Sequence, residues 1–510
     1  MQPNQQASQQ TPKDMFEHAK RLLAAGDVFE ASKRAGKLRA HFPEEPPILA
    51  IHGYALAKLG IHAPAINDMR ASSNLTLQSL KDGDEDNPAR PRIVDQFIHL
   101  QSEIGRSLTA LGEFDDAKDE IQRGLDMDPD RADAVTAMAE LSSAMGNTDE
   151  AVGLIEDALS RKLDEIPLYV SFAKILDDAA NADGGRMKEC AGRLGELCDE
   201  VGLAAGELMG VLRAHGRLCD RLGDYVGAYN SFRRAAKLRR GGFNPEMHAS
   251  ITRKIIENWT AESIDSLMRP EEKIGEKRVL LSGSVHSGMV EVQELIERLP
   301  NAVVVGPTES LGTLCATQLN AAKGVLRSVV PTPVGHRGDQ LGKLAMGYSQ
   351  QCDAAARMSG MITIDTHPHN LKLFGCVATA LPGVCLINCR RDPVEHALAL
   401  YCDEMPGNHP YAGDLIAAAS YVKDCELLMD HWTSVLNDER VGAKVINVQY
   451  EQLMNDPAAV LRQLGEAVGV EVGDDLTAGL EGAAAKGPGA HATEYGSASK
   501  QLREFFGVGV

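Results

Sequence analysis

The sequence has few aromatic residues and little positive charge. Only 5% of its 510 residues are Phe, Trp or Tyr, whereas 44% are apolar overall. This composition favours a helix-rich globular protein over a β-sandwich. Lys and Arg number 52 against 72 Asp and Glu, so the formal net charge is −20. Because proteins bind phosphate backbones through clustered Lys and Arg, the deficit argues against a nucleic-acid partner.

Features of secreted and membrane proteins are also missing. Met1–Thr11 is polar and Gln-rich, without the basic and apolar regions of a signal peptide. No apolar run approaches the length needed to span a membrane. The ten cysteines include no CxxC pair, which predicts buried thiols rather than a disulfide or zinc framework. We therefore expect a cytoplasmic protein without membrane contact, and the length predicts two to four domains.

An internal repeat marks the first half of the chain. A glycine is followed five residues later by an alanine at five places: Gly26/Ala31, Gly60/Ala65, Gly112/Ala117, Gly146/Ala151 and Gly223/Ala228. Two of the intervals between these glycines are 34 residues long (60 − 26 and 146 − 112). Glycine ends a first helix in a left-handed conformation, and alanine lets a second helix pack closely on it. The pattern resembles the tetratricopeptide repeat (TPR) over residues 13–255, with a generic α-solenoid as the alternative.

Two stretches interrupt this period. Ser72–Pro91, which ends in a run of Asp, Gly, Asn and Pro, is predicted to be an exposed insertion. Residues 160–215 are predicted to contain one or two degenerate repeats. Stacked repeats form a concave surface, so we expect a protein or peptide partner there.

From Arg278 the pattern changes to short apolar runs separated by helical segments, which predicts a mainly parallel sheet with helices on both faces. The expected strands are Arg278–Ser282, Ala302–Val305, Met361–Ile364, Val384–Asn388 and Lys444–Val448. The expected helices are Ser287–Leu299, Pro393–Cys402, Ala417–Leu436 and Asp456–Val468. Ligands of such sheets bind at the carboxyl ends of the strands.

The first expected strand leads into a possible phosphate loop. Gly283 and Gly288 frame a Gly-x4-Gly turn between strand and helix, where backbone N–H groups can hold an anion. A nucleoside-triphosphatase would continue with Lys and then Ser or Thr. Met289 and Val290 stand there instead, which argues against a kinase or an NTPase.

Motifs further along the chain point to one family. Cys389–Pro393 reads Cys-Arg-Arg-Asp-Pro after a strand, Asn408–Tyr411 reads Asn-His-Pro-Tyr, and Tyr450-Glu451 precedes Leu453 and Asp456-Pro457. With His431-Trp432 and the lead-in Trp259–Glu262, this order resembles the bacterial TPR-containing sulfotransferases, relatives of protein-tyrosine sulfotransferases. The resemblance implies an α-solenoid followed by a P-loop-like α/β domain. It also implies transfer of a sulfuryl group from 3′-phosphoadenosine 5′-phosphosulfate (PAPS) to a hydroxyl of a protein, glycan or small molecule, without a metal.

The resemblance assigns roles residue by residue. Gly283, His286, Ser287 and Gly288 fall on the phosphosulfate loop, where the family has an arginine at the position of His286. Arg391 falls on the 3′-phosphate arginine. The general base falls on Glu309, which could equally be an ordinary carboxylate at a helix start, just as His286 could be an ordinary loop histidine.

Several family residues are replaced. The loop threonines are Met289 and Val290, the 3′-phosphate serine is Ala399, and the lysine of the Asp-Lys-x-Pro segment is Thr366. Loss of the loop arginine, the two threonines and the serine, at about 1.4 kcal/mol for each contact, would weaken nucleotide binding by about four decades. His336, Arg337, Lys343 and His369 lie in segments that could supply compensating cations.

Two hypotheses therefore remain open: a PAPS-dependent sulfotransferase with an altered loop, and a TPR scaffold whose sulfotransferase-like domain has lost its chemistry. The second predicts that Met289 and Val290 fill the phosphate space. The expected organisation is a disordered N-terminus (1–12), TPR-like repeats (13–255), a linker (256–276), the sulfotransferase-like domain (277–480) and a C-terminal tail (481–510).

Overall fold

In a computed structural model the chain forms two compact units, one of residues 1–242 with 402–413, the other of residues 243–401 with 414–510. The structure describes residues 11–84, 86–161, 165–179, 183–239, 242–267, 274–306, 311–312, 314–315, 338–358, 360–403, 409–441, 443–483 and 487–509. The five-part division expected from the sequence stays a prediction.

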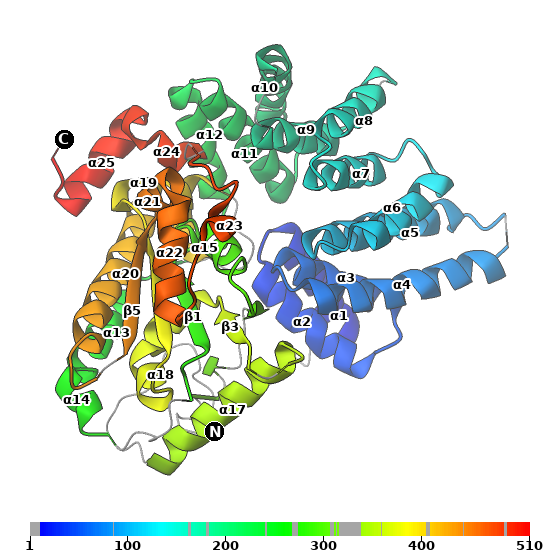
Figure 1. Ribbon diagram of the computed structural model, residues 1–510. Coiled ribbons are helices and arrows are strands. Elements are labelled where there is room, and N and C mark those ends of the chain that lie inside the picture. Colours follow the sequence, from blue (N-terminus) through cyan, green and yellow to red (C-terminus); the bar gives the residue numbers. More distant parts are fainter. Residues whose placement is uncertain are drawn as a thin grey trace, which may run out of the picture. The chain divides into compact units, whose positions relative to one another are not determined.

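The first unit is a row of antiparallel helix pairs (Figure 1). Its helices are α1 (Pro12–Ala24), α2 (Val28–His41), α3 (Pro46–Lys58), α4 (His62–Asp82), α5 (Arg90–Ala110), α6 (Phe114–Met127), α7 (Ala132–Ala144), α8 (Thr148–Ser160), α9 (Ile166–Asp178), α10 (Gly184–Cys198), α11 (Ala205–Arg221) and α12 (Tyr225–Leu238).

The predicted glycine–alanine step is confirmed. All five repeat glycines have φ between 76° and 83°, a left-handed conformation that other residues adopt at a cost. All five alanines are completely buried where the second helix of a pair meets the first. Each repeat therefore requires a left-handed backbone conformation at the glycine and a small side chain at the alanine. The α9/α10 pair occupies the region in which degenerate repeats were expected.

The exposed insertion predicted at Ser72–Pro91 is wrong over its first half, because α4 continues to Asp82. Ser72 and Thr76 are buried, and their hydroxyls donate to the carbonyls of Pro46 (2.8 Å) and Ser72 (2.8 Å). Because these hydrogen bonds satisfy the two buried hydroxyls, this polar segment can remain helical and packed against its neighbours.

The second unit contains a five-stranded parallel sheet with the order β2-β3-β1-β4-β5. The strands are β1 (Arg278–Gly283), β2 (Ala302–Gly306), β3 (Ile362–Asp365), β4 (Cys385–Arg390) and β5 (Lys444–Gln449). The helices are α13 (Pro245–Asn258), α14 (Ala261–Asp265), α15 (Met289–Ile296), α17 (Gly338–Ala355), α18 (Phe374–Ala380), α19 (Pro393–Cys402), α20 (Leu415–Leu436), α21 (Tyr450–Asn455), α22 (Pro457–Val468), α23 (Asp474–Thr477), α24 (Gly487–Ala490) and α25 (Gly496–Phe506), with 3-10 turns η1 (Pro368–Leu373), η2 (Pro410–Gly413) and η3 (Ala492–Glu494).

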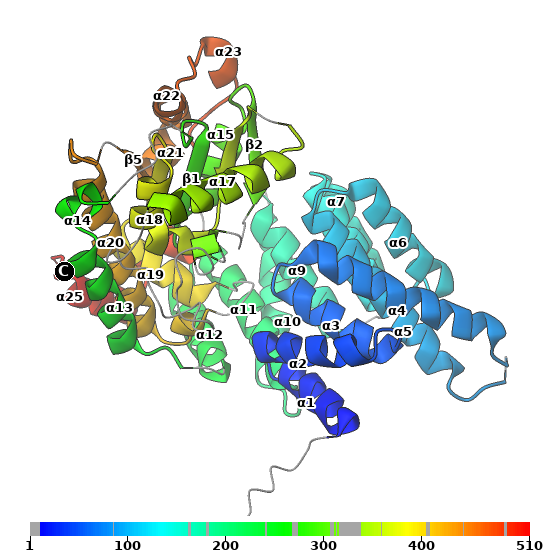
Figure 2. The same cartoon turned by 90° about the horizontal axis from the view of Figure 1, so that it is seen from below.

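Side chains of the central strand alternate between two cores. Leu280 packs with residues of α17, α18 and α20, whereas Val279 and Leu281 pack with residues of α15 and α22. Figure 2 shows α15 and α22 on one side of the strands and α18 and α20 on the other. The predicted fold class is thereby confirmed: an α-helical repeat region and an α/β unit with helices on both faces of a parallel sheet.

Three further observations concern the cysteines, the tryptophans and the helices that could cross a membrane. All ten cysteines are buried free thiols. Trp259 and Trp432 are buried in the core of the second unit, where the Trp432 indole N–H donates to the Leu371 carbonyl (2.7 Å). Within the described residues, no helix has both the length and the apolar character needed to cross a membrane.

Candidate anion-binding site at the ends of β1 and β4

The strand order creates a crevice at the carboxyl ends of β1 and β4. After β1 the chain continues toward β2 at one edge of the sheet, and after β4 it continues toward β5 at the other. Ligands of open parallel sheets bind where the connections diverge in this way. Gly283 at the end of β1 is in register with Cys389 of β4, so the loop after β1 and the Arg390-Arg391 pair after β4 flank one crevice.

Glycines fix the shape of the loop. A Cβ on Gly283 would lie 2.3 Å from the Ser287 Oγ atom and 3.0 Å from the Cys389 Cβ atom. Gly288 has φ +92° and precedes α15, and a Cβ there would lie 2.9 Å from the Tyr450 ring. Both positions therefore exclude larger residues.

His286 adopts a left-handed backbone conformation, with φ +64°. For a residue with a side chain this conformation costs of order 1–3 kcal/mol, and such strain is concentrated at functional sites. The Ser287 N–H donates to the Ser284 carbonyl (3.1 Å), which closes the turn. The loop thus combines a tight turn with two left-handed residues, His286 and Gly288, before a helix.

Two side chains from the far side of the crevice hold the loop carbonyls. The Arg391 Nη1 atom donates to the His286 carbonyl (3.3 Å), and the His396 Nε2 atom pairs with the Val285 carbonyl (2.8 Å). A carbonyl cannot donate, so His396 carries its proton on Nε2. Burial, with smaller effects of the nearby Arg391 and His286, lowers the His396 pKa to about 3, so its ring is neutral at pH 7.

Arg391 is enclosed by other groups. Its guanidinium lies over the Tyr450 ring, 4.4 Å from the centroid, and its Nη2 atom is 3.4 Å from the Glu395 carboxylate. A Cβ on Gly489 of α24 would lie 2.6 Å from the same Nη2 atom, so the C-terminal segment packs directly on the guanidinium. Burial raises the Glu395 pKa, and the charge of Arg391 opposes that shift.

Three buried polar atoms around the loop have no hydrogen-bond partner among the described residues: Ser287 Oγ, Arg391 Nε and His396 Nδ1. Two of them are donors and the third, with the proton on Nε2, is an acceptor. Buried polar groups are normally satisfied, so orphaned donors at a strand-end loop fit an anionic ligand.

The segment after β3 also reaches this edge of the sheet. Thr366, which replaces the expected lysine, donates its hydroxyl to the Gly306 carbonyl at the end of β2 (2.6 Å). Lys372 follows in η1, where burial lowers its pKa and the nearby Cys425 and Asp424 of α20 oppose that effect.

The remaining predicted residues are placed unevenly. Gly283, His286, Ser287, Gly288 and Arg391 come together at one crevice. The predicted base Glu309 lies outside the described residues, as do His336, Arg337 and the side chain of His369. Lys343 is exposed on α17.

Comparisons with known proteins agree with this organisation. Residues 108–175 match the model of the tetratricopeptide repeat, and residues 335–474 match the model of the sulfotransferase family. The chain carries a TPR region and a sulfotransferase-family domain. Arg391 and His396 lie inside the matched part of the sulfotransferase-family domain, whereas the loop 283–288 precedes it.

Solved structures similar to this chain are TPR proteins. One from Parabacteroides merdae is 15% identical, covers 46% of this chain and 82% of its own, and has a TM-score of 0.33. A thermophilic TPR protein from Thermus thermophilus is 16% identical, covers 40% of this chain and 98% of its own, and has a TM-score of 0.31. No curated protein matches the chain.

Two residues of the site were missed at the sequence level. His396 interrupts an apolar helix between Val394 and Ala397, five positions after Arg391, and that interruption was the available signal. Tyr450 was named only as part of a family motif, but its ring supports Arg391. The neighbouring Glu451 carboxylate accepts from the Asp392 N–H (2.8 Å).

Proposed function

We propose that the sulfotransferase-family domain binds PAPS at the loop 283–288 and transfers its sulfuryl group to a hydroxyl of a protein, glycan or small molecule. The observation that carries the proposal is the set of buried, unpartnered donors, Ser287 Oγ and Arg391 Nε, beside a strained loop at the end of β1. Acceptor oxygens of a phosphate or sulfate would satisfy both donors.

Each residue has a defined task in this proposal. PAPS, when bound, supplies the sulfuryl group. Ser287 would donate its hydroxyl proton and Arg391 its Nε–H to anionic oxygens, while the N-terminus of α15 faces the same charge. His396 acts on the loop rather than on the ligand, because its bond to Val285 sets the turn. Glu309 is proposed to accept the proton of the acceptor hydroxyl.

A second candidate is a non-catalytic scaffold, and one observation favours it. The guanidinium of Arg391 is already engaged by His286, Glu395 and the Tyr450 ring, and Gly489 packs on it. A scaffold was expected to have Met289 and Val290 in the space of the phosphate. Val290 does not fill that space, because it is 64% exposed. Met289 does pack partly against the core beside α22.

We further propose that the repeats bind a protein or peptide on their concave surface, since stacked repeats commonly do so. The location is proposed to be the cytoplasm. Neither proposal depends on whether the second unit is catalytic.

Ser287→Ala gives the most direct test of the nucleotide site. Calorimetric titration with 3′-phosphoadenosine 5′-phosphate should show about 10- to 100-fold weaker binding than the parent, because a hydrogen bond to a charged group is worth about 1.5–3 kcal/mol. Without nucleotide the same variant should be about 1 kcal/mol more stable, since an unsatisfied buried hydroxyl is removed.

Ser349→Ala is the matched control. Ser349 Oγ is also buried without a partner among the described residues, but it lies on α17. The control should gain similar stability and leave nucleotide affinity unchanged. His286→Arg, which restores the family cation, should tighten binding. Absence of binding by both the parent and His286→Arg at millimolar nucleotide would favour the scaffold.

A further inference from the structure

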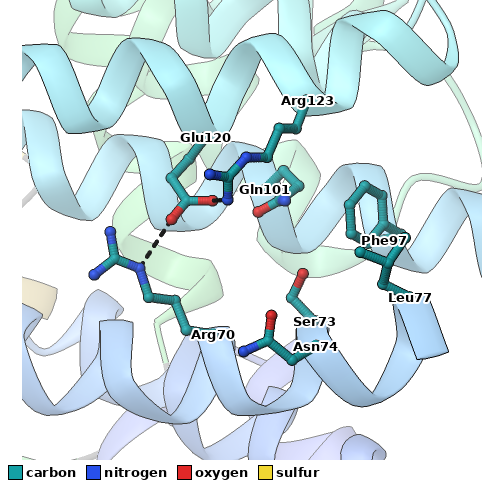
Figure 3. A pocket seen from close by; sticks show the side chains of 8 residues that line it. All are labelled: Arg70, Ser73, Asn74, Leu77, Phe97, Gln101, Glu120 and Arg123. Atoms are coloured by element: carbon teal, nitrogen blue, oxygen red, sulfur yellow. Dashed lines mark hydrogen bonds and ion pairs between the residues drawn. The ribbon is translucent and has the colours of Figure 1, made fainter.

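The repeat region contains a cavity of about 280 Å³ between α4, α5 and α6 (Figure 3). The first helices of successive pairs form a row, in which α5 packs against α7, α7 against α9 and α9 against α11. The second helices α4 and α6 also both contact α5. The cavity is therefore lined by two second helices and by α5, which belongs to the row of first helices.

A buried amide forms its floor. Gln101 on α5 is 2% exposed, and its Oε1 atom accepts no hydrogen bond from any described residue. Figure 3 shows this oxygen directed into the space between α4 and α5, with the Ser73 hydroxyl pointing into the same space. A buried acceptor that faces a cavity is suited to a ligand with an N–H or O–H donor.

Two arginines give one side of the cavity a net positive charge. The buried Glu120 carboxylate accepts from Arg70 Nε (2.9 Å) and from Arg123 Nη1 (2.9 Å), one bond on each oxygen. Two guanidiniums thus surround a single carboxylate, leaving one unit of positive charge. The arginine side chains are 41% and 61% exposed, and each guanidinium has five N–H groups, so donors remain for a bound anion.

The other side is apolar. Figure 3 shows Phe97 and Leu77 on the side of the cavity away from Arg70. Phe97 is 4% exposed, so its ring is held in place by the helix packing. The cavity therefore joins a cationic rim, a hydrogen-bond acceptor and an apolar wall within the reach of one small molecule.

We propose that this cavity binds a small monocarboxylic acid that has an apolar side chain and an N–H or O–H donor beside the carboxylate. The carboxylate would pair with Arg70 and Arg123, the donor with Gln101, and the side chain with Phe97. A single negative charge matches the net charge of the rim. A volume just below the range of about 300–1,000 Å³ typical of ligand sites suits one amino-acid residue, either free and N-acylated or at the end of a peptide.

Nuclear magnetic resonance titration of the full chain tests the proposal with three probes: N-acetyl-L-leucine, its carboxamide, and a hexapeptide that ends in leucine. We expect the acid to bind with a Kd in the millimolar range or below. The carboxamide should bind about 10- to 100-fold more weakly, because its charge-assisted bonds are lost. Tighter binding of the hexapeptide than of the acid would identify a chain end as the source of the ligand.

Two variants locate the site. Gln101→Met removes the buried acceptor at nearly constant volume, and Arg70→Met removes one cation while Arg123 still pairs with Glu120. Each should weaken binding of the acid about tenfold or more. Arg92→Met, which removes an exposed charge from the same helix α5, should leave the affinity unchanged.

Circular dichroism establishes that each variant is folded before its affinity is compared. Three results would overturn the proposal: no binding of the acid or the hexapeptide at millimolar concentration, equal binding of acid and carboxamide, or binding that neither Gln101→Met nor Arg70→Met weakens. The first of these would mean that the cavity holds water only.

Discussion

Acidification should destabilise the second unit through His396. In the folded chain its pKa is about 3, because burial of the ring outweighs the hydrogen bond to the Val285 carbonyl, which acts in the opposite direction, whereas the ordinary histidine value is 6.5. A histidine whose folded pKa is lowered stabilises the protein fully above the unfolded pKa. That contribution is lost as the pH falls from about 6.5 toward 3, because the unfolded chain takes up the proton first.

The size of this loss follows from the two pKa values. At pH 5 the unfolded state binds almost one proton at this position, compared with about a quarter of a proton at pH 7, whereas the folded state binds almost none at either pH. The linkage relation then gives a loss of about 2 kcal/mol from this group alone.

The matched variant is His396→Gln, which keeps an N–H donor for the Val285 carbonyl but does not titrate. Urea unfolding followed by tryptophan fluorescence reports on the second unit specifically, because both tryptophans, Trp259 and Trp432, lie in its core. The difference in unfolding free energy between parent and variant should change by about 2 kcal/mol between pH 7 and pH 5. If the two pH profiles run parallel, the ring is not held neutral by burial and the reasoning is wrong.

Two further predictions concern packing. Gly105→Ala should destabilise the repeat region by about 1–3 kcal/mol, because the new Cβ would lie 2.3 Å from Ile121 Cγ1 at the α5/α6 contact. Gly153→Ala, with no atom within 4 Å of the new Cβ, should instead stabilise it by up to about 1 kcal/mol in thermal unfolding followed by circular dichroism. Trp432→Phe should cost about 2–4 kcal/mol in urea unfolding, since it leaves the buried Leu371 carbonyl without its donor and creates a void; a cost near zero would contradict this.

The parts of the fold that were predictable depend on local requirements. Gly26 and its counterparts need a left-handed conformation, and each following alanine needs only to be small, so the repeat is visible in the sequence. The five strands are equally visible as short apolar runs: the inner strands β1, β3 and β4 are buried almost throughout, and the edge strands β2 and β5 keep apolar residues although they are only partly buried.

The errors and omissions involve contacts between distant residues. Ser72 was assigned to a loop because its sequence is polar, but a hydroxyl bond to Pro46, 26 residues earlier, makes helix possible. His396 acts on Val285, 111 residues earlier, and no spacing rule connects them. The cavity beside Gln101 is formed by residues of three helices, so the sequence alone could not show it.

The segment Cys402–Gly413 groups with the first unit although it lies between α19 and α20 of the second. Arg217 of α11 pairs with Asp403, and Arg239, which follows α12, donates to the His409 carbonyl (3.0 Å), so these contacts hold the described residues of the segment. During synthesis the first part of this unit ends at residue 242, which is made 171 residues (413 − 242) before the segment is complete. At about 5–20 residues per second, the ribosome needs roughly 10–30 s to synthesise these residues, and during that time the first unit lacks the segment Cys402–Gly413. A nascent chain is therefore open to chaperones at α11 and α12 for that interval.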